Sequence, residues 1–522
     1  MVEANGHHKS GAKYNGEFMK KNVLVHFIFA DKKWMGGIYY IKNILFQLSI
    51  SVQAKEKYNL YLCTNDSVMD EFQDLAEEMN ITVIEYDHTL EQILKICSAY
   101  NIHVVLPITG GEYTWLLKDI CLYWIPDFQD VFLPENFERE EVEYRKQLRK
   151  YIAHEHRGLI LSSKDSYSHY KMLYPDNIQN VFVAHFTSCI STAAEQITDS
   201  YTANVMGKYG IEYDYVFVAN QFWKHKNHIV VLKAMDKIIN EEKKELHLVC
   251  TGLLQSYAGK NEYVNELYQY IERHSLSRYI HFLGLLERTE QLCIMENSQM
   301  LIQPSKFEGW GCSVEDAKAM GKVILLSDID VHKEQQYPKS VLFPQDDGEA
   351  LADIILNQWG KNVKFDLEYG RNYAMEKAIE YSEELQAAID SIEVNENKNY
   401  LSELFRMRSE KINSLFGGLP ANQICVYGVG NYAREILKGC KAVLEDTHFI
   451  YSDSNAEKWG KDFDEGKIYP PQQLLSMGIK RIVILSPRYQ EEIYQQIKGF
   501  EKDMEIRKLF CSEKERWEML WI

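Results

Sequence analysis

The sequence has no long apolar run, no paired-cysteine motif and no excess of basic residues. No run approaches the roughly 18 consecutive apolar residues of a membrane-spanning helix, so we expect none. The ten cysteines are scattered without any C-x-x-C pair, which predicts mostly buried, reduced thiols in a cytoplasmic protein and disfavours a zinc site. The net charge of −18 argues against a nucleic-acid partner, because phosphate backbones need a basic surface.

The N-terminal segment lacks the apolar core of a signal peptide. We therefore expect a disordered tail at residues 1–21, in which His7 and His8 belong to the tail and not to a metal site. We expect no metal ion in the protein. Local basic patches leave peripheral contact with the cytoplasmic face of a membrane open.

The length of 522 residues exceeds what one core can organise and predicts three domains. In the first part, apolar strand patterns alternate with helical patterns, which is typical of an α/β doubly wound fold. We expect its strands at residues 22–30, 58–63, 82–86, 103–107, 158–162 and 181–185. We assign residues 22–205 to an N-terminal domain, 206–372 to a second domain, 373–418 to a helical crossover and linker, and 419–522 to a third domain.

The second domain repeats the pattern, with strands expected at residues 213–219, 247–251, 280–284, 300–302 and 323–327. Its polar residues gather after the strands. Ligands of open α/β sheets bind at that edge.

The stretch Pro304–Ala317 lies between an apolar strand and a helix that we expect to end at Gly321. It contains Gly309 and Gly311, and such a loop brings backbone N–H groups to a helix N-terminus, where they can hold a phosphate. Acidic side chains flank the loop: Glu308, Glu315 and Asp316. Phosphate and hydroxyl recognition together favour a nucleotide sugar; alternatively, the glycines only shape a turn.

Three other stretches could contribute to this site. Gly36 and Gly37 follow the first strand and precede a helix expected at residues 38–50, and Lys224 and Lys226 lie in a strand-to-helix loop, where cations could clamp a diphosphate. Residues 122–129 and 133–135 contain two prolines and several aromatic residues, which suggests a shaped loop. Asp127 in it either faces a cleft or caps a turn.

The third domain opens with a strand followed by G-x-G-x-x-A at Gly428–Ala433, as in a dinucleotide-binding fold. Further strands are expected at residues 448–451 and 481–486, and Asp453 could meet a ribose. We therefore consider Gly428, Gly430 and Asp453 as a candidate nucleotide-binding site, with NAD among the ligands considered. The alternative is that the glycines serve only the turn and close packing.

Three motifs together resemble the family 4 retaining glycosyltransferases, whose GT-B fold has two facing Rossmann-like domains. The motifs are Phe307–Gly311 with Glu315–Ala319, Ala219–Asn227, and Trp124–Gln129 with Leu133–Glu135, the last as in a bacterial branch of the family. The resemblance covers roughly residues 22–390. The third domain looks like the small Rossmann-like modules appended to some bacterial sugar-modifying enzymes.

The resemblance implies transfer of a sugar from a nucleoside diphosphate sugar, UDP- or GDP-linked, to an acceptor hydroxyl without a metal or other cofactor. The acceptor would be a glycan, a lipid-linked sugar or a protein. The implied catalytic residues are Glu308, Asp127 on the acceptor side, and Lys226. The implied donor-binding residues are Gly36, Gly37, Asn220, Gln221, Lys226, Gly252, Glu308, Gly309, Trp310, Gly311, Cys312, Ser313 and Asp316.

Two positions depart from the family pattern. The second acidic position is Asp316, one methylene shorter than Glu, with Glu315 beside it, and Gln221 stands where the family often has Arg. These departures keep a second hypothesis open, a catalytically weak scaffold or regulatory subunit. A sugar-nucleotide oxidoreductase centred on the third domain is a further alternative, and that domain could also mediate homo-oligomers or bind a partner protein.

Overall fold

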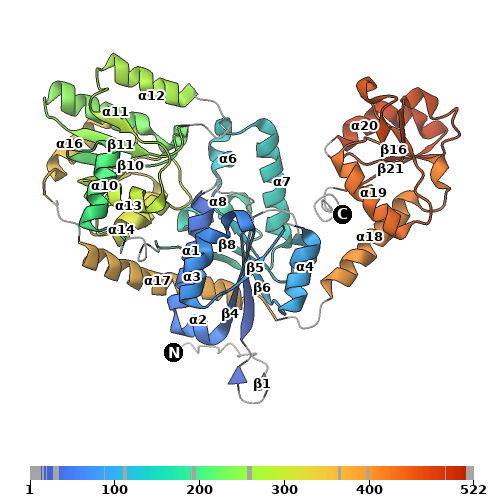
Figure 1. Cartoon of the computed structure of the whole chain (residues 1–522), viewed down its shortest axis with the longest axis horizontal. Coiled ribbons are helices and arrows are strands. Elements are labelled where there is room, and N and C mark those ends of the chain that lie inside the picture. The colour runs from blue at the N-terminus through green and yellow to red at the C-terminus, as the bar shows by residue number, and fades with distance from the viewer. Residues whose placement is uncertain are drawn as a thin grey trace.

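The computed structural model describes residues 13–14, 17–18, 20–27, 35–87, 89–109, 114–188, 190, 196–254, 262–361, 366–394, 399–487 and 489–512. Within the expected tail, β1 (Lys13–Tyr14) and β2 (Glu17–Phe18) form a short antiparallel pair. His7 and His8 lie outside the described residues. The chain then forms three α/β units, the third set apart at one end of the molecule (Figure 1).

The first domain is built on a seven-stranded parallel sheet in the order β5-β4-β3-β6-β7-β8-β9. Its central strands are continuous apolar runs, as expected for a sheet that helices cover on both faces. The strands are β3 (Lys21–His26), β4 (Tyr58–Thr64), β5 (Thr82–Glu85), β6 (Val104–Ile108), β7 (Cys121–Ile125), β8 (Gly158–Leu161) and β9 (Val181–Val183). All of the predicted strands are present, with ends shifted by a few residues.

Several helices of this domain begin at residues whose side chains cap them. Asn65, Thr89 and Ser163 each accept a hydrogen bond from a first-turn N–H group of the helix that follows. The helices are α1 (Met35–Ile50), α2 (Val52–Lys57), α3 (Asp66–Met79), α4 (Leu90–Ala99), α5 (Thr114–Leu117), α6 (Gln129–Phe132), η1 (Pro134–Asn136), α7 (Arg139–Glu155) and α8 (Lys164–Leu173).

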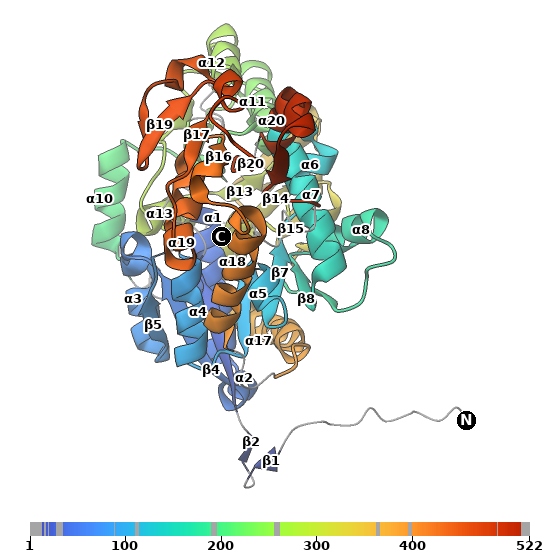
Figure 2. The ribbon, with the colours of Figure 1, turned by 90° about the vertical axis from the view of Figure 1, so that its right-hand side faces the viewer.

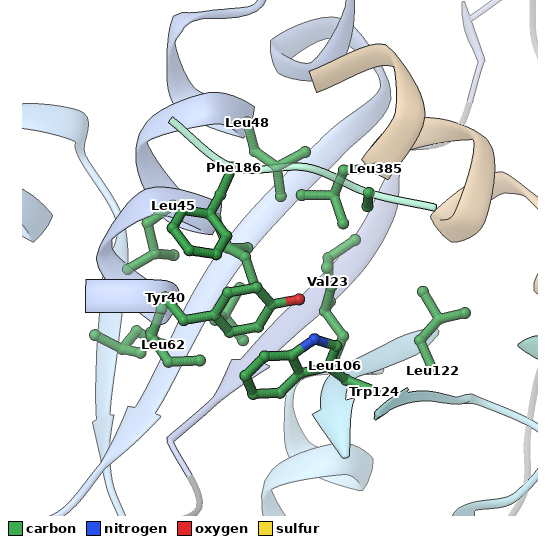
Figure 3. Packing of buried hydrophobic residues seen from close by; sticks show 14 of the residues in the cluster. Val23, Tyr40, Leu45, Leu48, Leu62, Leu106, Leu122, Trp124, Phe186 and Leu385 are labelled. Atoms are coloured by element: carbon green, nitrogen blue, oxygen red, sulfur yellow. The ribbon is translucent and has the colours of Figure 1, made fainter. Parts of the chain in front are cut away.

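The prediction of an irregular loop at residues 122–129 is wrong in its first half. Residues 121–125 form β7, and all five are buried, because the run is apolar throughout. Trp124 stacks on Tyr40 of α1 with ring centroids 3.7 Å apart, and Phe186 packs edge-on against Tyr40 (Figure 3). Pro126, which lacks an N–H group, follows the strand. The aromatic residues therefore mark a core strand, and the shaped loop begins only after it.

The second domain has a six-stranded parallel sheet in the order β12-β11-β10-β13-β14-β15. Its strands are β10 (Tyr215–Ala219), β11 (His247–Thr251), β12 (Ile280–Phe282), β13 (Met300–Gln303), β14 (Ile324–Ser327) and β15 (Ser340–Phe343). Its helices are α10 (Asp199–Tyr209), η2 (Lys224–Lys226), α11 (His228–Asp236), η3 (Lys237–Glu241), α12 (Glu262–Arg273), α13 (Arg288–Asn297), α14 (Cys312–Ala319), α15 (Asp330–Glu334) and α16 (Gly348–Gln358).

Two elements of this domain were not expected. The edge strand β15 has mixed burial and a weak apolar pattern. Residues 187–208 are polar and weakly patterned, which predicts an interdomain linker, but most of α10 lies in this segment. This helix begins after the capping residue Thr198, ends at Gly210 with φ +64°, and packs against α13. A capping Thr and a terminal Gly are the sequence signals that could have revealed this helix.

Two helices connect the three units. α17 (Leu367–Asp390) packs against α14 of the second domain and against α1 and β9 of the first, so it returns the chain across both. α18 (Tyr400–Phe416) starts in the core of the first domain and ends in the core of the third. Figure 2 shows α18 lying beside α4 and leading into the third domain, and Arg408 of α18 pairs with Glu91 of α4 at 2.6 Å.

The third domain has a six-stranded sheet in the order β18-β19-β17-β16-β20-β21, parallel except for the β18–β19 hairpin. Its strands are β16 (Ile424–Tyr427), β17 (Ile450–Ser452), β18 (Asp462–Phe463), β19 (Gly466–Tyr469), β20 (Arg481–Ile484) and β21 (Glu505–Lys508). Its helices are η4 (Ala421–Gln423), α19 (Asn431–Val443), η5 (Ala456–Lys458), η6 (Pro471–Gln473), α20 (Gln490–Ile497) and η7 (Lys498–Lys502).

Within the described ranges, no helix is both long and apolar enough to span a membrane. The nine described cysteines are free thiols, and seven of them are buried, in agreement with the prediction of reduced cysteines.

Candidate active site

Gln303, the last residue of β13, organises the loop that follows. Its amide nitrogen donates to Glu308 Oε1 at 2.8 Å and to Ser305 Oγ at 3.2 Å. Its amide oxygen accepts from Asn220 Nδ2 and from Ser313 Oγ, both at 3.1 Å. One buried side chain thus fixes the loops after β10 and β13 together. The sequence reasoning missed this residue, although a polar residue that ends an apolar strand before a proline is a usable signal.

Glu308 and Lys226 form a buried ion pair. Lys226 Nζ lies 2.6 Å from Glu308 Oε1, and the two side chains are 14% and 9% exposed. Burial would raise the pKa of Glu308, but the Lys226 charge and hydrogen bonds from Lys226 and Ser305 outweigh burial and lower that pKa to about 2. Glu308 is therefore an ionised carboxylate at any physiological pH.

Asp127 of the first domain reaches the same place. A Cβ atom at Gly309 would lie 2.3 Å from the Pro126 carbonyl oxygen and 3.2 Å from Asp127 Cβ, so the Glu308 loop touches the Asp127 loop directly. Asp127 Oδ1 accepts the Gln129 N–H at 3.0 Å, and burial together with the nearby Glu308 charge raises the pKa of Asp127. The three predicted catalytic residues thus lie together where the first and second domains meet.

Further contacts hold the two domains against each other at this point. Gln129 Nε2 lies 2.7 Å from His225 Nδ1, and the rings of Phe307 and His169 stack with centroids 5.8 Å apart. Trp310 is buried in the core of the first domain and donates its indole N–H to the Phe186 carbonyl at 2.9 Å. This predicted donor-contact residue therefore anchors the loop to the first domain.

The helix α14 begins at this loop, with Gly311 as an N-cap that provides no side-chain hydrogen bond. The Gly311 N–H, predicted to hold the donor, donates instead to Gln335 Oε1 at 3.1 Å. Cys312 and Ser313 are the first two helical residues, and amides at these positions have no acceptor within their own helix. The anion-binding capacity of the loop is thus concentrated on Cys312 and Ser313.

Neither acidic side chain after the loop is free. Asp316 accepts both guanidinium nitrogens of Arg288 at 2.6 Å and also accepts the Ser188 hydroxyl from the first domain. Glu315 is buried and pairs with Lys318 at 2.8 Å. Sequence reasoning did not single out Arg288, because nothing in the sequence around it indicates that it pairs with Asp316.

Gly36 and Gly37 form the first turn of α1, which starts at Met35 and not at Ile38 as expected. Tyr39, two positions after Gly37, lies under the Arg288 guanidinium, with 4.4 Å between Arg288 Cζ and the ring centroid. The N-terminus of α1 therefore approaches the second domain close to α14.

Gln221 and Gly252 shape the neighbouring loops. Gln221 Oε1 accepts the Leu253 N–H at 2.7 Å. Gly252 has φ +137°, and a Cβ atom there would lie 2.2 Å from the Asn220 carbonyl oxygen, so only glycine allows the two loops to meet. Gln221 thus braces a loop at the position where an Arg would have carried charge.

In the third domain, the predicted residues Gly428, Gly430 and Asp453 lie around one cavity. Asp453 Oδ2 accepts the Val429 N–H at 3.1 Å and pairs with Lys458 at 2.8 Å, so its carboxylate holds the glycine loop. No group of three or more His, Cys, Asp or Glu side chains suited to a metal ion occurs in the described part of the chain.

One family profile and several solved structures are similar to parts of this chain. Residues 205–370 match the profile of the family described as "Glycosyl transferases group 1". No curated protein matches the chain. Among solved structures, HepE of Anabaena in complex with UDP and glucose superimposes with a TM-score of 0.52 at 14% identity, covering 71% of this chain and 100% of that one.

A second structure of the same protein, in complex with UDP-glucose, gives a TM-score of 0.50 at 14% identity and covers 70% of this chain and 99% of that one. A glycosyltransferase from Rickettsia africae has a TM-score of 0.49 at 14% identity, covering 76% of this chain and 99% of that one.

The first two domains therefore have the GT-B fold, two Rossmann-like sheets with the candidate site where they meet, and a third sheet follows. The profile match covers about a third of the chain and lies in the second domain, which contains the Lys226–Glu308 pair and the N-terminus of α14.

Proposed function

We propose that the protein is a retaining, metal-independent transferase that moves a sugar from a nucleoside diphosphate sugar to an acceptor hydroxyl in the synthesis of a glycan, a cell-surface polysaccharide or a glycoprotein. The observation that carries the proposal is the buried Lys226–Glu308 pair beside Asp127 and the uncapped N-terminus of α14. This arrangement offers a cation and oriented N–H groups to a diphosphate, and carboxylates to sugar hydroxyls. The UDP and UDP-glucose complexes of HepE support a UDP-linked donor.

The proposed reaction breaks the bond between the anomeric carbon and the diphosphate oxygen, and forms a bond from that carbon to the acceptor oxygen on the same face. The acceptor proton passes to the departing phosphate oxygen. Lys226 and the amides of Cys312 and Ser313 stabilise the negative charge that develops on the diphosphate, which replaces a metal ion in this role. Arg288, held by Asp316, adds a further cation near the N-terminus of α1.

The two carboxylates have different roles in this proposal. Glu308, ionised and fixed by Gln303, accepts hydrogen bonds from the donor sugar. Asp127 lies on the first-domain side, where the acceptor would enter, and its raised pKa makes it the more basic carboxylate. Double displacement through Glu308 as nucleophile is disfavoured, because its pairing with Lys226 lowers its basicity and holds its Oε1 atom.

The proposal is tested with a panel of UDP- and GDP-linked sugars in the presence of EDTA. We expect slow donor hydrolysis with at least one of them and, once an acceptor is found, a product whose anomeric configuration, read by NMR, equals that of the donor. An inverted product would overturn the retaining mechanism, and loss of activity in EDTA would overturn metal independence.

The engagement of Asp316 by Arg288 and of Gln221 by Leu253 also bears on the alternative, a catalytically weak scaffold. Both positions serve the fold here, where the family pattern has ligand-binding groups. Absence of turnover across the whole panel, combined with retained diphosphate binding, would favour that alternative over the enzyme.

A further inference from the structure

The third domain contains an open cavity of about 640 Å³ at the carboxyl ends of its central strands. The chain leaves β16 toward β17 and β19 on one side and later returns to β20 and β21 on the other, so the cavity lies at the topological switch point of the sheet. Ligands of open α/β sheets bind at such points, and cavities of roughly 300–1,000 Å³ hold small molecules.

The two glycines of the loop differ in what they are for. Gly428 has φ +86°, and a Cβ atom there would lie 2.9 Å from Ser486 Cβ, so the fold itself requires a glycine at this position. Gly430 has an extended backbone with φ −148°, and a Cβ atom there would meet nothing within 4 Å. Within the part of the chain that the structure describes, neither strain nor crowding explains a glycine at residue 430.

Gly430 is the N-cap of α19, a 13-residue helix, and contributes no side-chain hydrogen bond to it. Ser, Thr, Asp and Asn are preferred at an N-cap because their oxygens accept the first N–H groups of the helix. Asn431, the first residue of the helix, lines the cavity, and an amide at this position has no acceptor within its own helix. The open space at Gly430 and the N-terminus of the helix leave room and positive potential for an anion of the ligand.

The groups around this position also restrict what the ligand can be. Asp453 is committed to the Val429 N–H and to Lys458, so it is not available to a ribose in the manner of a dinucleotide fold. Beyond the loop, the wall carries Pro487, the half-exposed ring of Tyr489 and the carboxylate of Glu492. A flat ring can pack along the first two, and a carboxylate suits hydroxyl groups.

We infer that this cavity binds a nucleoside mono- or diphosphate, with its phosphate at the N-terminus of α19 and its ring and ribose along Pro487, Tyr489 and Glu492. The site is separate from the candidate active site, and the inference does not depend on the proposed transfer reaction. It gives the third domain a binding role that residues 205–370 do not provide.

The experiment uses the full chain with Lys226→Ala, which weakens the diphosphate site of the first two domains. UDP, GDP, ADP, AMP, NAD and inorganic phosphate are titrated by calorimetry, and hydrogen–deuterium exchange locates the protection. We expect one nucleoside phosphate to bind with a stoichiometry of one and to protect residues 428–434. Adding Gly430→Asp should weaken binding by at least about tenfold, because the new carboxylate caps α19 and repels the phosphate.

The matched control is Gly499→Asp in the same domain, where a Cβ atom also meets nothing within 4 Å and which does not line the cavity. It adds the same charge and should leave binding unchanged, and Gly430→Asp should fold at least as stably as the parent. Binding that survives Gly430→Asp would overturn the inference. So would equal affinity for inorganic phosphate, which indicates an anion site only, or a strong preference for NAD.

Discussion

The loops at Gly309–Gly311 and Gly428–Gly430 share one local plan. Each follows a buried parallel strand, carries two glycines and leads into a helix without a side-chain cap. An ion pair and the surface of another domain lie around the first loop, whereas a cavity borders the second loop. The glycine motif therefore predicts an anion site in both places, and the surrounding residues decide the chemistry.

The difference comes from residues distant in sequence. Lys226 lies in the loop after β10, and Asp127 belongs to the first domain. Other parts of the chain therefore bring charged groups to the first loop and cover it. Among the described residues at the second loop, Asp453 and Lys458 pair with each other, and Glu492 lies across the cavity in the same domain. The first loop is thus completed by residues from two domains, whereas the described lining of the second cavity comes from the third domain alone.

The largest expected effect is the loss of Lys226. Lys226→Ala should lower kcat/KM for sugar transfer by about 10³-fold, because a preorganised charge on the leaving group is removed. The matched control is Lys224→Ala, whose exposed side chain lies two positions earlier and should change the rate less than about twofold. Equal effects of the two substitutions would show that Lys226 contributes no more to transfer than an exposed lysine of the same loop.

Because Lys226→Ala also leaves Glu308 buried without its partner, its folding is checked separately by circular dichroism. Glu308→Gln keeps the shape and the hydrogen bonds to Gln303 while removing the charge. A rate that is normal in Glu308→Gln would show that the carboxylate is structural, whatever Lys226→Ala does.

The two acidic residues that follow the loops provide the next comparison. Asp316→Asn should destabilise the protein by about 3 kcal/mol, because it leaves the Arg288 guanidinium without a counter-charge in a buried site. Asp453→Asn should cost less, about 1 kcal/mol, because the Lys458 side chain is 40% exposed and can turn to water. Urea unfolding curves give both values.

The same Asp316→Asn variant addresses the role of Asp316 in donor binding. If Asp316 serves the fold, Asp316→Asn lowers stability more than it raises the donor KM. A large rise in KM at unchanged stability would instead assign Asp316 to the donor, as the resemblance implies.

Much of the fold could be predicted from the sequence, because buried parallel strands are apolar runs and the cores depend on them. The strands β3, β10, β11 and β13 were recognisable in this way. β7 was hidden because its aromatic residues and the proline after it resembled a loop, and α10 was hidden because its apolar face is narrow. Local patterns cannot show which faces the rest of the chain will cover.

The residues of the candidate active site also fall into those that sequence motifs predicted and those that they could not. Glu308, Lys226 and Asp127 were predicted through motifs, and the structure brings them together. Gln303 and Arg288 could not be assigned, because their roles come from hydrogen bonds to partners on other loops and helices. Trp310 was placed on the donor, but an indole next to an interdomain surface is buried there instead.

A smaller effect is expected from one methyl group added to each loop. Gly309→Ala would place Cβ against the Pro126 carbonyl and push the domains apart, so we expect a loss of roughly tenfold to 10²-fold in transfer rate, as for small displacements of catalytic groups. Gly430→Ala meets open space and should leave transfer unchanged. Similar rates for both variants would indicate that the contact at Gly309 is not needed for catalysis.

The smallest expected effect concerns two ion pairs of His185, here called the clasp, which join the first domain to α15 and α17. His185, after β9, lies 2.6 Å from Glu334 of α15 and 2.8 Å from Glu384 of α17. Burial would lower the pKa of His185, but the hydrogen bonds and charges of the two carboxylates raise it to about 9.

Because the folded-state pKa of His185 lies above the unfolded value of about 6.5, the protonated clasp stabilises the protein fully below about pH 6.5. This stabilisation is lost as the pH rises through 9. We therefore expect the melting temperature of the wild type to fall between pH 6.5 and 9.5 more steeply than that of His185→Gln, by a few degrees. His448→Gln, at an exposed histidine of the third domain, should follow the wild-type slope. Parallel slopes for wild type and His185→Gln would show that this histidine does not couple the domains to pH.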